Sequence, residues 1–434
     1  MKHRSAIVTG GCGFIGVHCV KRLLEQGHSV LCIDNLSRRG AQANLNWIAR
    51  DPKRLPGSFN FDQTDIRRFE ELENVFRKHV HRHGNPEVVI HQAAQVAVTQ
   101  SVAQPRIDFE TNALGTFNVL EAVRRICPDA TIIFASTNKV YGSLESVEVC
   151  ELDERYEFRT LKTGIPSSHP VDPSTPYGCS KCAADHYMRD YSRIYGLRTL
   201  VFRQSCVYGT RQFGEEDQGW VSWFAIAAAL RGDINVFGRG KQLRDLLWID
   251  DLLDAYWMAW HSGLPGQVFN IGGGPQNSLS VVELIKLLKE LSSDETFNMR
   301  VRQFSTRPGD QLVYVSDISE LTQKLGWRPK ISPRQGVEWL CEWVKRNRAE
   351  IEEVALRADD VHDVQDPGFE AVHEMKGESF RESTNVRRAD ASRGTDYNSN
   401  GLCVKGVPVE AQNSNEHVTT RVSQFHRGGS FHRR

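Results

Sequence analysis

Residues 5–16 read SAIVTGGCGFIG, and this stretch decides the fold. The apolar run 6–8 predicts a buried strand, and glycines at positions 10, 13 and 16 follow it at intervals of three. Apolar residues at helical spacing then continue to Leu24. The glycines let backbone approach a pyrophosphate closely, and the start of the helix directs its N–H groups toward negative charge. The stretch therefore predicts a dinucleotide site in a strand–helix–strand unit.

Asp34 ends the second apolar run, 30–33, and lies 18 residues after Gly16. A carboxylate at this place accepts hydrogen bonds from the adenosine ribose and repels a 2′-phosphate, which favours NAD over NADP. Arg38 and Arg39 lie close by and weaken that preference. Two other interpretations stay open: the glycines are structural turn glycines, or Asp34 is an ordinary loop or capping acid.

Further buried strands are predicted at 88–90, 131–134 and 199–202, with helix-compatible stretches between them. This alternation predicts an α/β fold, a Rossmann-type doubly wound parallel sheet covered on both faces. We assign it to residues 1–203. In residues 204–348 the alternation of strands and helices ends. This part of the sequence predicts a smaller mixed α/β substrate-binding cap, from which short segments of the chain can return to the first domain. Residues 349–434 form a tail, expected to be disordered from about 375 because its few apolar residues cannot offset the ordering entropy.

The composition restricts the partners of the chain. Lys plus Arg and Asp plus Glu number 54 each in 434 residues, and a formal net charge of zero argues against nucleic acid and anionic lipid as partners. No apolar run reaches the roughly 18 residues of a membrane span, and we expect no secretory signal. Ten irregularly spaced cysteines indicate a reducing compartment, the cytoplasm. Cys179 and Cys182 lack a second ligand pair, so we predict no metal.

Tyr177 and Lys181 are four residues apart and share one face of a predicted helix. A nearby ammonium lowers the pKa of a phenol from about 10 toward the working pH. Such a tyrosine can remove a proton from a sugar hydroxyl while hydride leaves the carbon. The pair therefore predicts oxidation and reduction with a nicotinamide cofactor.

These motifs together resemble the extended short-chain dehydrogenase/reductase family of nucleotide-sugar epimerases and dehydratases, over about residues 4–345. The resemblance is carried by the glycine motif, Asp65-Ile66, residues 91–95 (HQAAQ), Asn112, residues 136–142 (STNKVYG), the Tyr177/Lys181 pair, Arg244-Asp245 before 248–251 (WIDD), and residues 269–273 (FNIGG). Within the family, residues 136–139, 176–181, 208–213 and 217–220 are most similar to the subgroup of CDP-paratose 2-epimerases, also called CDP-tyvelose epimerases.

The resemblance implies a role for each matching residue. Thr137 joins Tyr177 and Lys181 in catalysis, because its hydroxyl would hold the sugar oxygen that Tyr177 deprotonates. The implied NAD contacts are Gly10, Gly13, Phe14, Ile15, Gly16, Asp34, Asn35, Ser37, Arg38, Asp65, Ile66, Ala93, Gln95, Asn112, Ser136, Tyr177 and Lys181. The implied contacts to the nucleotide-sugar substrate are Asn138, Lys139, Arg211, Gln212, Gln218, Arg244 and Arg307. Asp65 as a turn residue, Gln95 as a surface residue, Lys139 as a loop lysine and the arginines as surface residues stay open. The family also implies a homodimer or homotetramer.

Asn138 and Lys139 stand where the sugar 4,6-dehydratases carry Asp-Glu. An amide cannot protonate a leaving hydroxyl, which disfavours dehydration. We therefore expect an isomerase: an NAD-dependent epimerase that oxidises a nucleotide sugar to a keto sugar and reduces it on the opposite face, at C2 of a CDP-linked sugar. The alternatives are a UDP-sugar C4-epimerase, a nucleotide-sugar 4,6-dehydratase, and a non-catalytic NAD-sensing scaffold of the same fold.

Overall fold

The computed structural model describes residues 4–50, 55–230, 232–291, 300–305 and 310–362. Its centre is a seven-stranded sheet whose neighbouring strands are all parallel, in the order β12-β8-β5-β4-β1-β2-β3. The strands are β1 (Ser5–Thr9), β2 (Ser29–Ile33), β3 (Ser58–Asp62), β4 (Val88–His91), β5 (Thr131–Thr137), β8 (Arg198–Gln204) and β12 (Gln267–Ile271). The predicted Rossmann-type sheet is confirmed.

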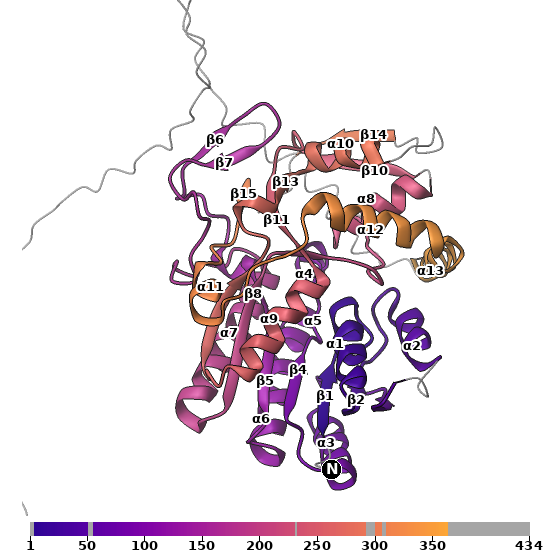
Figure 1. The fold of residues 1–434 in the computed structure, drawn as a ribbon, viewed down its shortest axis with the longest axis vertical. Helices are drawn as coiled ribbons and strands as arrows, with labels where there is room; N and C mark the ends of the chain where they lie inside the picture. Colours follow the sequence, from indigo (N-terminus) through magenta and orange to yellow (C-terminus); the bar gives the residue numbers. More distant parts are fainter. Residues whose placement is uncertain (1–3, 51–54, 231, 292–299, 306–309, 363–434) are drawn as a thin grey trace, which may run out of the picture.

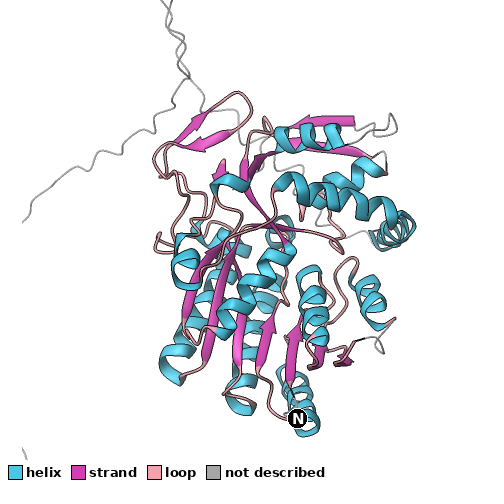
Figure 2. Cartoon of the chain, in the orientation of Figure 1, coloured by secondary structure: helices cyan, strands magenta, loops and turns pink. Residues whose placement is uncertain are grey.

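Helices cover both faces of this sheet (Figure 2). Successive residues of a strand point to opposite faces, so Ala6 and Val8 belong to one buried cluster and Ile7 to another. The first cluster includes side chains of α1 (Phe14–Glu25) and α9 (Ile249–His261), and the second those of α3 (Phe69–His83), α6 (Gly115–Ile126) and α7 (Pro176–Tyr195). Burial on both faces explains why β1 reads as an unbroken apolar run.

Shorter elements join the layers around the ends of the strands. They are α2 (Ala41–Ala49), α4 (Val98–Ala103), α5 (Pro105–Phe109), the π-helix η2 (Glu110–Leu114), the 3₁₀-helices η3 (Asn138–Tyr141) and η4 (Pro275–Asn277), and the antiparallel pair β6 (Val149–Glu151) and β7 (Tyr156–Phe158).

Most of the residues from 204 to 346 build the cap. Its sheet contains β9 (Cys206–Tyr208), β11 (Leu243–Trp248), β13 (Ser278–Ser280) and β15 (Val313–Tyr314), and β10 (Asp233–Phe237) pairs with β14 (Arg300–Phe304). Helices α8 (Trp220–Ala229), α10 (Val281–Leu291) and α12 (Pro333–Arg346) pack with it. Figure 1 shows the cap above one end of the seven-stranded sheet. The chain returns to that sheet through α9 and β12, and α11 (Ser319–Leu325) packs against β12.

Helix α13 (Arg348–His362) follows α12 and begins one residue before the predicted tail. Its Ile351 is only 2% exposed and belongs to the large core cluster. The segment 375–434, for which we expect disorder, lies outside the described residues. Within the described ranges, none of the helices is both long and apolar enough to cross a membrane.

Candidate active site

The glycine-rich loop is packed so tightly that side chains would not fit at two of its positions. Gly10 adopts a left-handed conformation with φ of +67°, and a Cβ there would collide with the backbone of Ala93 at the end of β4. A Cβ at Gly16 would collide with the carbonyl group of Gly10. Gly13 is the N-cap of α1, and Phe14 and Ile15 form its first turn. The loop and the start of α1 thus present backbone to the carboxyl end of the sheet.

Asp34 directly follows β2 and fastens this loop. Its carboxylate accepts hydrogen bonds from the backbone N–H groups of Cys12 at 2.9 Å and Leu36 at 2.8 Å. Burial raises the pKa of Asp34, and these backbone donors oppose that shift. Asp34 therefore joins the glycine-rich loop to the loop after β2.

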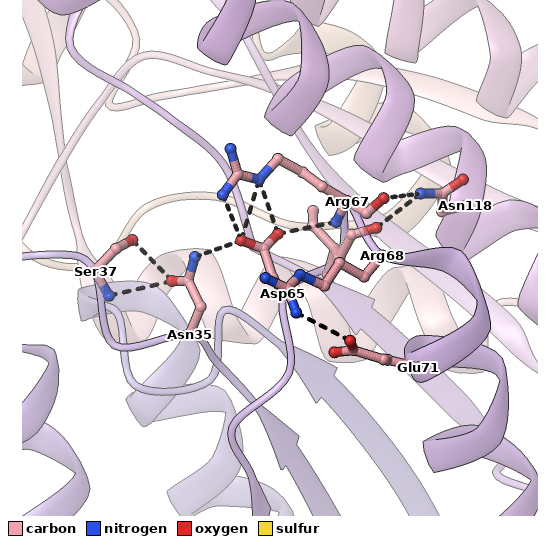
Figure 3. Close-up of polar contacts among 8 residues, drawn as sticks. Asn35, Ser37, Asp65, Arg67, Arg68, Glu71 and Asn118 are labelled. Atoms are coloured by element: carbon pink, nitrogen blue, oxygen red, sulfur yellow. Dashed lines mark hydrogen bonds and ion pairs between the residues drawn. The ribbon is translucent and has the colours of Figure 1, made fainter.

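Asn35, Ser37 and Asp65 lie together where β2 and β3 end (Figure 3). Asn35 donates to Asp65 at 3.2 Å, and the backbone and hydroxyl of Ser37 donate to Asn35. Burial acts to raise the pKa of Asp65, but the hydrogen bonds from Arg67 outweigh it and the pKa is lowered. These polar groups therefore form one hydrogen-bonded cluster at the carboxyl ends of β2 and β3.

Ile66 is buried beside Asp65, and its backbone carbonyl accepts a hydrogen bond from Asn118 of α6 at 2.9 Å. Its side chain fills the space above Gly115, where a Cβ would not fit. Neither Arg67 nor Asn118 was identified from the sequence. Asn118 carried no local signal, because the backbone of Ile66 that it binds lies 52 positions away in the chain.

A buried polar network connects Gln95 and Asn112 to the catalytic helix. Asn112 lies in the π-helix η2, accepts from the Gln95 backbone at 2.9 Å, and donates to Asp108 at 3.0 Å and Ser180 at 3.1 Å. Gln95 also donates to Asp108, at 3.2 Å. Gln95 is buried in this network, not displayed on the surface. Asp108 of α5 and Ser180 of α7 were not predicted as site residues, because their contact joins segments that lie 72 positions apart in the chain.

Thr137, Tyr177 and Lys181 meet at the carboxyl end of β5. Thr137 is the last residue of that strand, while Tyr177 and Lys181 lie in the first two turns of α7, whose N-cap is Thr175. The Tyr177 phenol and the Thr137 hydroxyl share a hydrogen bond. All three catalytic candidates are buried. The structure thus brings together residues that are 40 or more positions apart in the chain.

Burial shifts the pKa of both titratable members of this group. It raises the pKa of Tyr177 to about 12, with Asp108 acting in the same direction and the Thr137 hydrogen bond and Arg38 opposing it. It lowers the pKa of Lys181 to about 7, against the charges of Asp185 and Asp108. The prediction that the phenol has a lowered pKa is therefore wrong for this structure, because the cost of burying a phenolate outweighs the nearby positive charge.

Ser136 faces away from Thr137 into a buried ion pair. Its hydroxyl donates to Asp185 at 2.8 Å, and Asp185 accepts two hydrogen bonds from Arg203, at 2.9 and 3.1 Å. Arg203 also donates to the Tyr141 hydroxyl at 3.0 Å. Asp185 on α7 and Arg203 on β8 were not identified from the sequence, although Asp185 lies one helical turn after Lys181. They connect the catalytic helix to the strand end.

The candidate substrate residues Asn138, Lys139 and Arg244 lie where the first domain meets the cap. Asn138 and Lys139 form the start of η3, and Arg244 of β11 pairs with Asp310 at 2.8 Å. Burial lowers the pKa of Lys139 to about 8; Arg244 adds to the shift and Asp310 opposes it. Two cationic side chains with one carboxylate are suited to a diphosphate.

Gln212 and Gln218 line a cavity of about 140 Å³ together with Cys206 and Trp220. Gln218 accepts a hydrogen bond at 2.7 Å from Arg38, whose charge also acts on Tyr177. Arg244 and Lys139 act on the Cys206 thiol, whose pKa is raised by burial. The charges of Lys139 and Arg244 therefore reach a residue that lines the cavity, and Arg38 links Gln218 to the surroundings of Tyr177.

Two remaining arginines are not placed in this cluster. The Arg211 guanidinium is bound by Asn44 and Glu350, and Arg307 lies outside the described residues. Cys179 is exposed and Cys182 is buried. In the ranges that the structure covers, no three His, Cys, Asp or Glu side chains gather in a way that could hold a metal ion.

Comparisons with known proteins agree with this geometry. The family described as GDP-mannose 4,6 dehydratase matches residues 7–340. A CDP-paratose 2-epimerase of Salmonella typhi is 42% identical over 344 residues, which are 78% of this chain and 98% of that relative. The structure of UDP-glucose 4-epimerase of Thermus thermophilus with NAD has a TM-score of 0.64 and 30% identity, covering 79% of this chain and 99% of that one. A dTDP-glucose 4,6-dehydratase of Streptomyces venezuelae with NAD bound has a TM-score of 0.67 and 28% identity, covering 81% and 99%. The chain therefore belongs to the GDP-mannose 4,6-dehydratase family of nucleotide-sugar epimerases and dehydratases, as its motifs predict, within the extended short-chain dehydrogenases/reductases.

Proposed function

We propose that this protein is an NAD-dependent nucleotide-sugar epimerase, an isomerase that inverts C2 of a CDP-linked sugar. The observation that carries the proposal is the hydrogen bond between Thr137 and Tyr177, with Lys181 one helical turn further along α7. The backbone of Lys139 binds Thr137, and the charge of Arg244 acts on the Lys139 side chain. The 42% identity to a CDP-paratose 2-epimerase supports the choice of sugar carbon and nucleotide.

The residues around the glycine-rich loop fit NAD. The packing at Gly10 and Gly16 leaves backbone exposed where a pyrophosphate would bind, and α1 begins there. Asp34, Asn35 and Asp65 would hold the adenosine half. The carboxylate of Asp34 favours NAD over NADP.

The chain's own residues divide the chemistry between them. NAD supplies the acceptor and the donor of the hydride. Thr137 holds a sugar hydroxyl, and Tyr177 takes its proton and later returns a proton to the keto oxygen. Because burial holds the pKa of Tyr177 at about 12, the hydrogen bond from Thr137 and the positive charge of Arg38, which both oppose that shift, are needed to make proton transfer favourable. The keto sugar must present its opposite face before it is reduced.

Dehydration does not suit the side chains at the sugar end of the site. Asn138 donates to Gln311 at 3.4 Å and holds its amide beside Thr137, and Lys139 is cationic below its pKa of about 8. Neither residue offers the carboxylic acid that eliminating water needs. The exchange of Asp-Glu for Asn-Lys therefore favours epimerisation over the 4,6-dehydratase activity named for several relatives.

A substrate panel tests the proposal. The purified protein is mixed with CDP-, UDP-, GDP- and dTDP-sugars, and products are identified by NMR. We expect inversion at C2 of a CDP-sugar, with deuterium placed at C2 retained in the product. A 4-keto-6-deoxy product would show a dehydratase, inversion at C4 of a UDP-sugar would show a C4-epimerase, and NAD binding without turnover would show a scaffold. The homodimer or homotetramer and the cytoplasmic location stay predictions.

A further inference from the structure

Arg211 is held in a setting that binding of a substrate diphosphate does not explain. Its backbone has a φ of +62°, in the left-handed region that a non-glycine residue rarely occupies. Its side chain is 3% exposed, and the rings of Trp47 and Phe213 each lie 5.2 Å from the guanidinium carbon. A guanidinium buried this deeply requires hydrogen-bond acceptors from the protein.

Those acceptors come from two distant parts of the chain. The Nε of Arg211 donates to Asn44 Oδ1 of α2 at 2.9 Å. Its two terminal nitrogens donate to the carboxylate of Glu350 at 2.7 and 3.1 Å, a bidentate ion pair. Glu350 lies in the first turn of α13, and in Figure 1 this helix lies on the side of the molecule that also carries α2.

Asn44 continues these contacts to the glycine-rich loop. Its amide donates to the carbonyl of Cys12 at 3.0 Å and to the carbonyl of Arg211 at 3.3 Å. The N–H of Cys12 donates to Asp34. Asn44 and Asp34 thus fix both polar backbone groups of the residue between Gly11 and Gly13. The glycine-rich loop is held from one side by Asp34 and from the other by Asn44, Arg211 and Glu350.

Helix α13 lies beyond residues 7–340, the part of the chain that the family shares. Its start is anchored, because Ile351 is buried in the core and Glu350 is only 24% exposed on its side chain. A segment outside the common family region therefore contacts a residue that supports the dinucleotide loop.

We propose that α13 is a working part of the NAD site: Glu350 positions Arg211 and Asn44, and these hold the Cys12 peptide in the conformation that retains NAD. The proposal rests on the NAD binding proposed above and not on the identity of the sugar. Glu350, Arg211 and Asn44 are positioning residues, since none of them is required to contact the cofactor.

The test compares two isosteric changes two residues apart on α13 in the full chain. Glu350→Gln removes the charge that pairs with Arg211. Glu352→Gln removes a charge whose partner is Arg348 on the surface, where the side chains are 45% and 55% exposed. We expect NAD titration by calorimetry to show about a 3- to 10-fold weaker affinity for Glu350→Gln, because only part of the loss of a charged hydrogen bond reaches the loop through Arg211 and Asn44. Glu352→Gln should match the wild type.

Hydrogen exchange of the backbone amides at 10–13 gives a second measurement that does not depend on any ligand. We expect faster exchange in Glu350→Gln and unchanged exchange in Glu352→Gln. If wild-type protein fails to bind NAD, the proposed function fails, while the exchange rates still report on the contact between α13 and the loop. Equal NAD affinity and equal exchange in the two variants would overturn the inference, even if Glu350→Gln lowered the melting temperature.

The variant Asn44→Ala tests whether Glu350 acts on the glycine-rich loop through Asn44 or independently of it. Because Glu350 acts through Asn44, the double variant Glu350→Gln with Asn44→Ala should bind NAD no more weakly than Asn44→Ala alone. Fully additive losses would show that Glu350 acts by another route and would contradict the proposal.

Discussion

At the scale of single residues, the Tyr177 hydroxyl is the proton acceptor that the proposed reaction depends on. Tyr177→Phe keeps the ring and its packing but removes this group, so turnover should fall about 10²- to 10⁴-fold. NAD affinity should stay near that of the wild type. Rapid-quench turnover and NAD titration measure the two quantities. Thr137→Ser keeps the bonding hydroxyl and should be mild, whereas Thr137→Val should be severe; equal activity in both would contradict the role of Thr137.

Lys181 predicts a pH dependence of stability. Its pKa is about 7 in the folded protein and 10.5 without burial. Between these values the unfolded chain binds more protons than the folded one, so burial of Lys181 costs the most stability below pH 7 and less as the pH rises. The free energy of unfolding of Lys181→Met should therefore exceed that of the wild type most at pH 6–7, and the difference should shrink toward pH 10.

Urea unfolding at several pH values checks this prediction, with Lys345→Met at an exposed lysine as the control. Wild type and Lys181→Met profiles that run parallel from pH 6 to 10 would mean that Lys181 is not the buried, destabilised ammonium that its surroundings indicate.

The proposed catalytic residues could be identified as candidates from the sequence, but their electrostatics could not be predicted. Tyr177 and Lys181 lie within one local motif, so their spacing alone places them on one helical face. Two carboxylates act on them. Asp185 lies one helical turn after Lys181, but Asp108 is brought close by a tertiary contact that no local pattern encodes. The depth of burial, which decides the direction of the Tyr177 pKa, is also a property of the whole fold.

At the scale of elements, the ion pair of Asp185 and Arg203 fastens α7 to β8. Their side chains are 1% and 3% exposed. Asp185→Asn leaves a buried guanidinium without its counter-charge, which should lower the free energy of unfolding by about 3–5 kcal/mol. Denaturant unfolding measures this loss. Glu342→Gln removes one partner of the exposed pair with Arg346 and should change little. A similarly small change for Asp185→Asn would contradict a structural role for the pair.

Elements were predictable where their apolar pattern is long or unbroken. Buried apolar runs in the sequence identify the strands β1, β2, β4, β5 and β8. β3 carries polar residues at alternate positions and was not identified. β12 was noted only as a motif, because its place at the edge of the central sheet depends on pairing with β8. α13 was included in the tail because its sequence is mostly polar, yet its Ile351 and Val354 pack against the core.

At the scale of the whole molecule, the proposed substrate site is shared between two parts of the chain. Lys139 comes from the first domain, and Arg244 and Asp310 come from the cap. The contact between Arg38 and Gln218 joins the same two parts. Arg244 and Asp310 are 66 residues apart in the chain, and Arg38 and Gln218 are 180 apart. These separations explain why the residues could be identified one by one, while their contacts between the first domain and the cap could not be predicted.

The position of α13 near the end of the described chain determines which truncations should preserve the melting temperature and NAD affinity. The tail predicted from residue 349 onward implies that a cut after about residue 350 leaves turnover and melting temperature nearly unchanged. The structure revises this, because such a cut removes Ile351 from the core and ends the chain at the residue that binds Arg211. A chain ending at residue 362 retains all of α13 and should keep the melting temperature and NAD affinity of the full chain. A chain ending at residue 347 should lose part of both. Thermal melting and NAD titration of the two truncated proteins check this. If the chain ending at 362 were as impaired as the one ending at 347, residues 363–434 would be needed for the folded state. The prediction that this segment is dispensable would then be wrong.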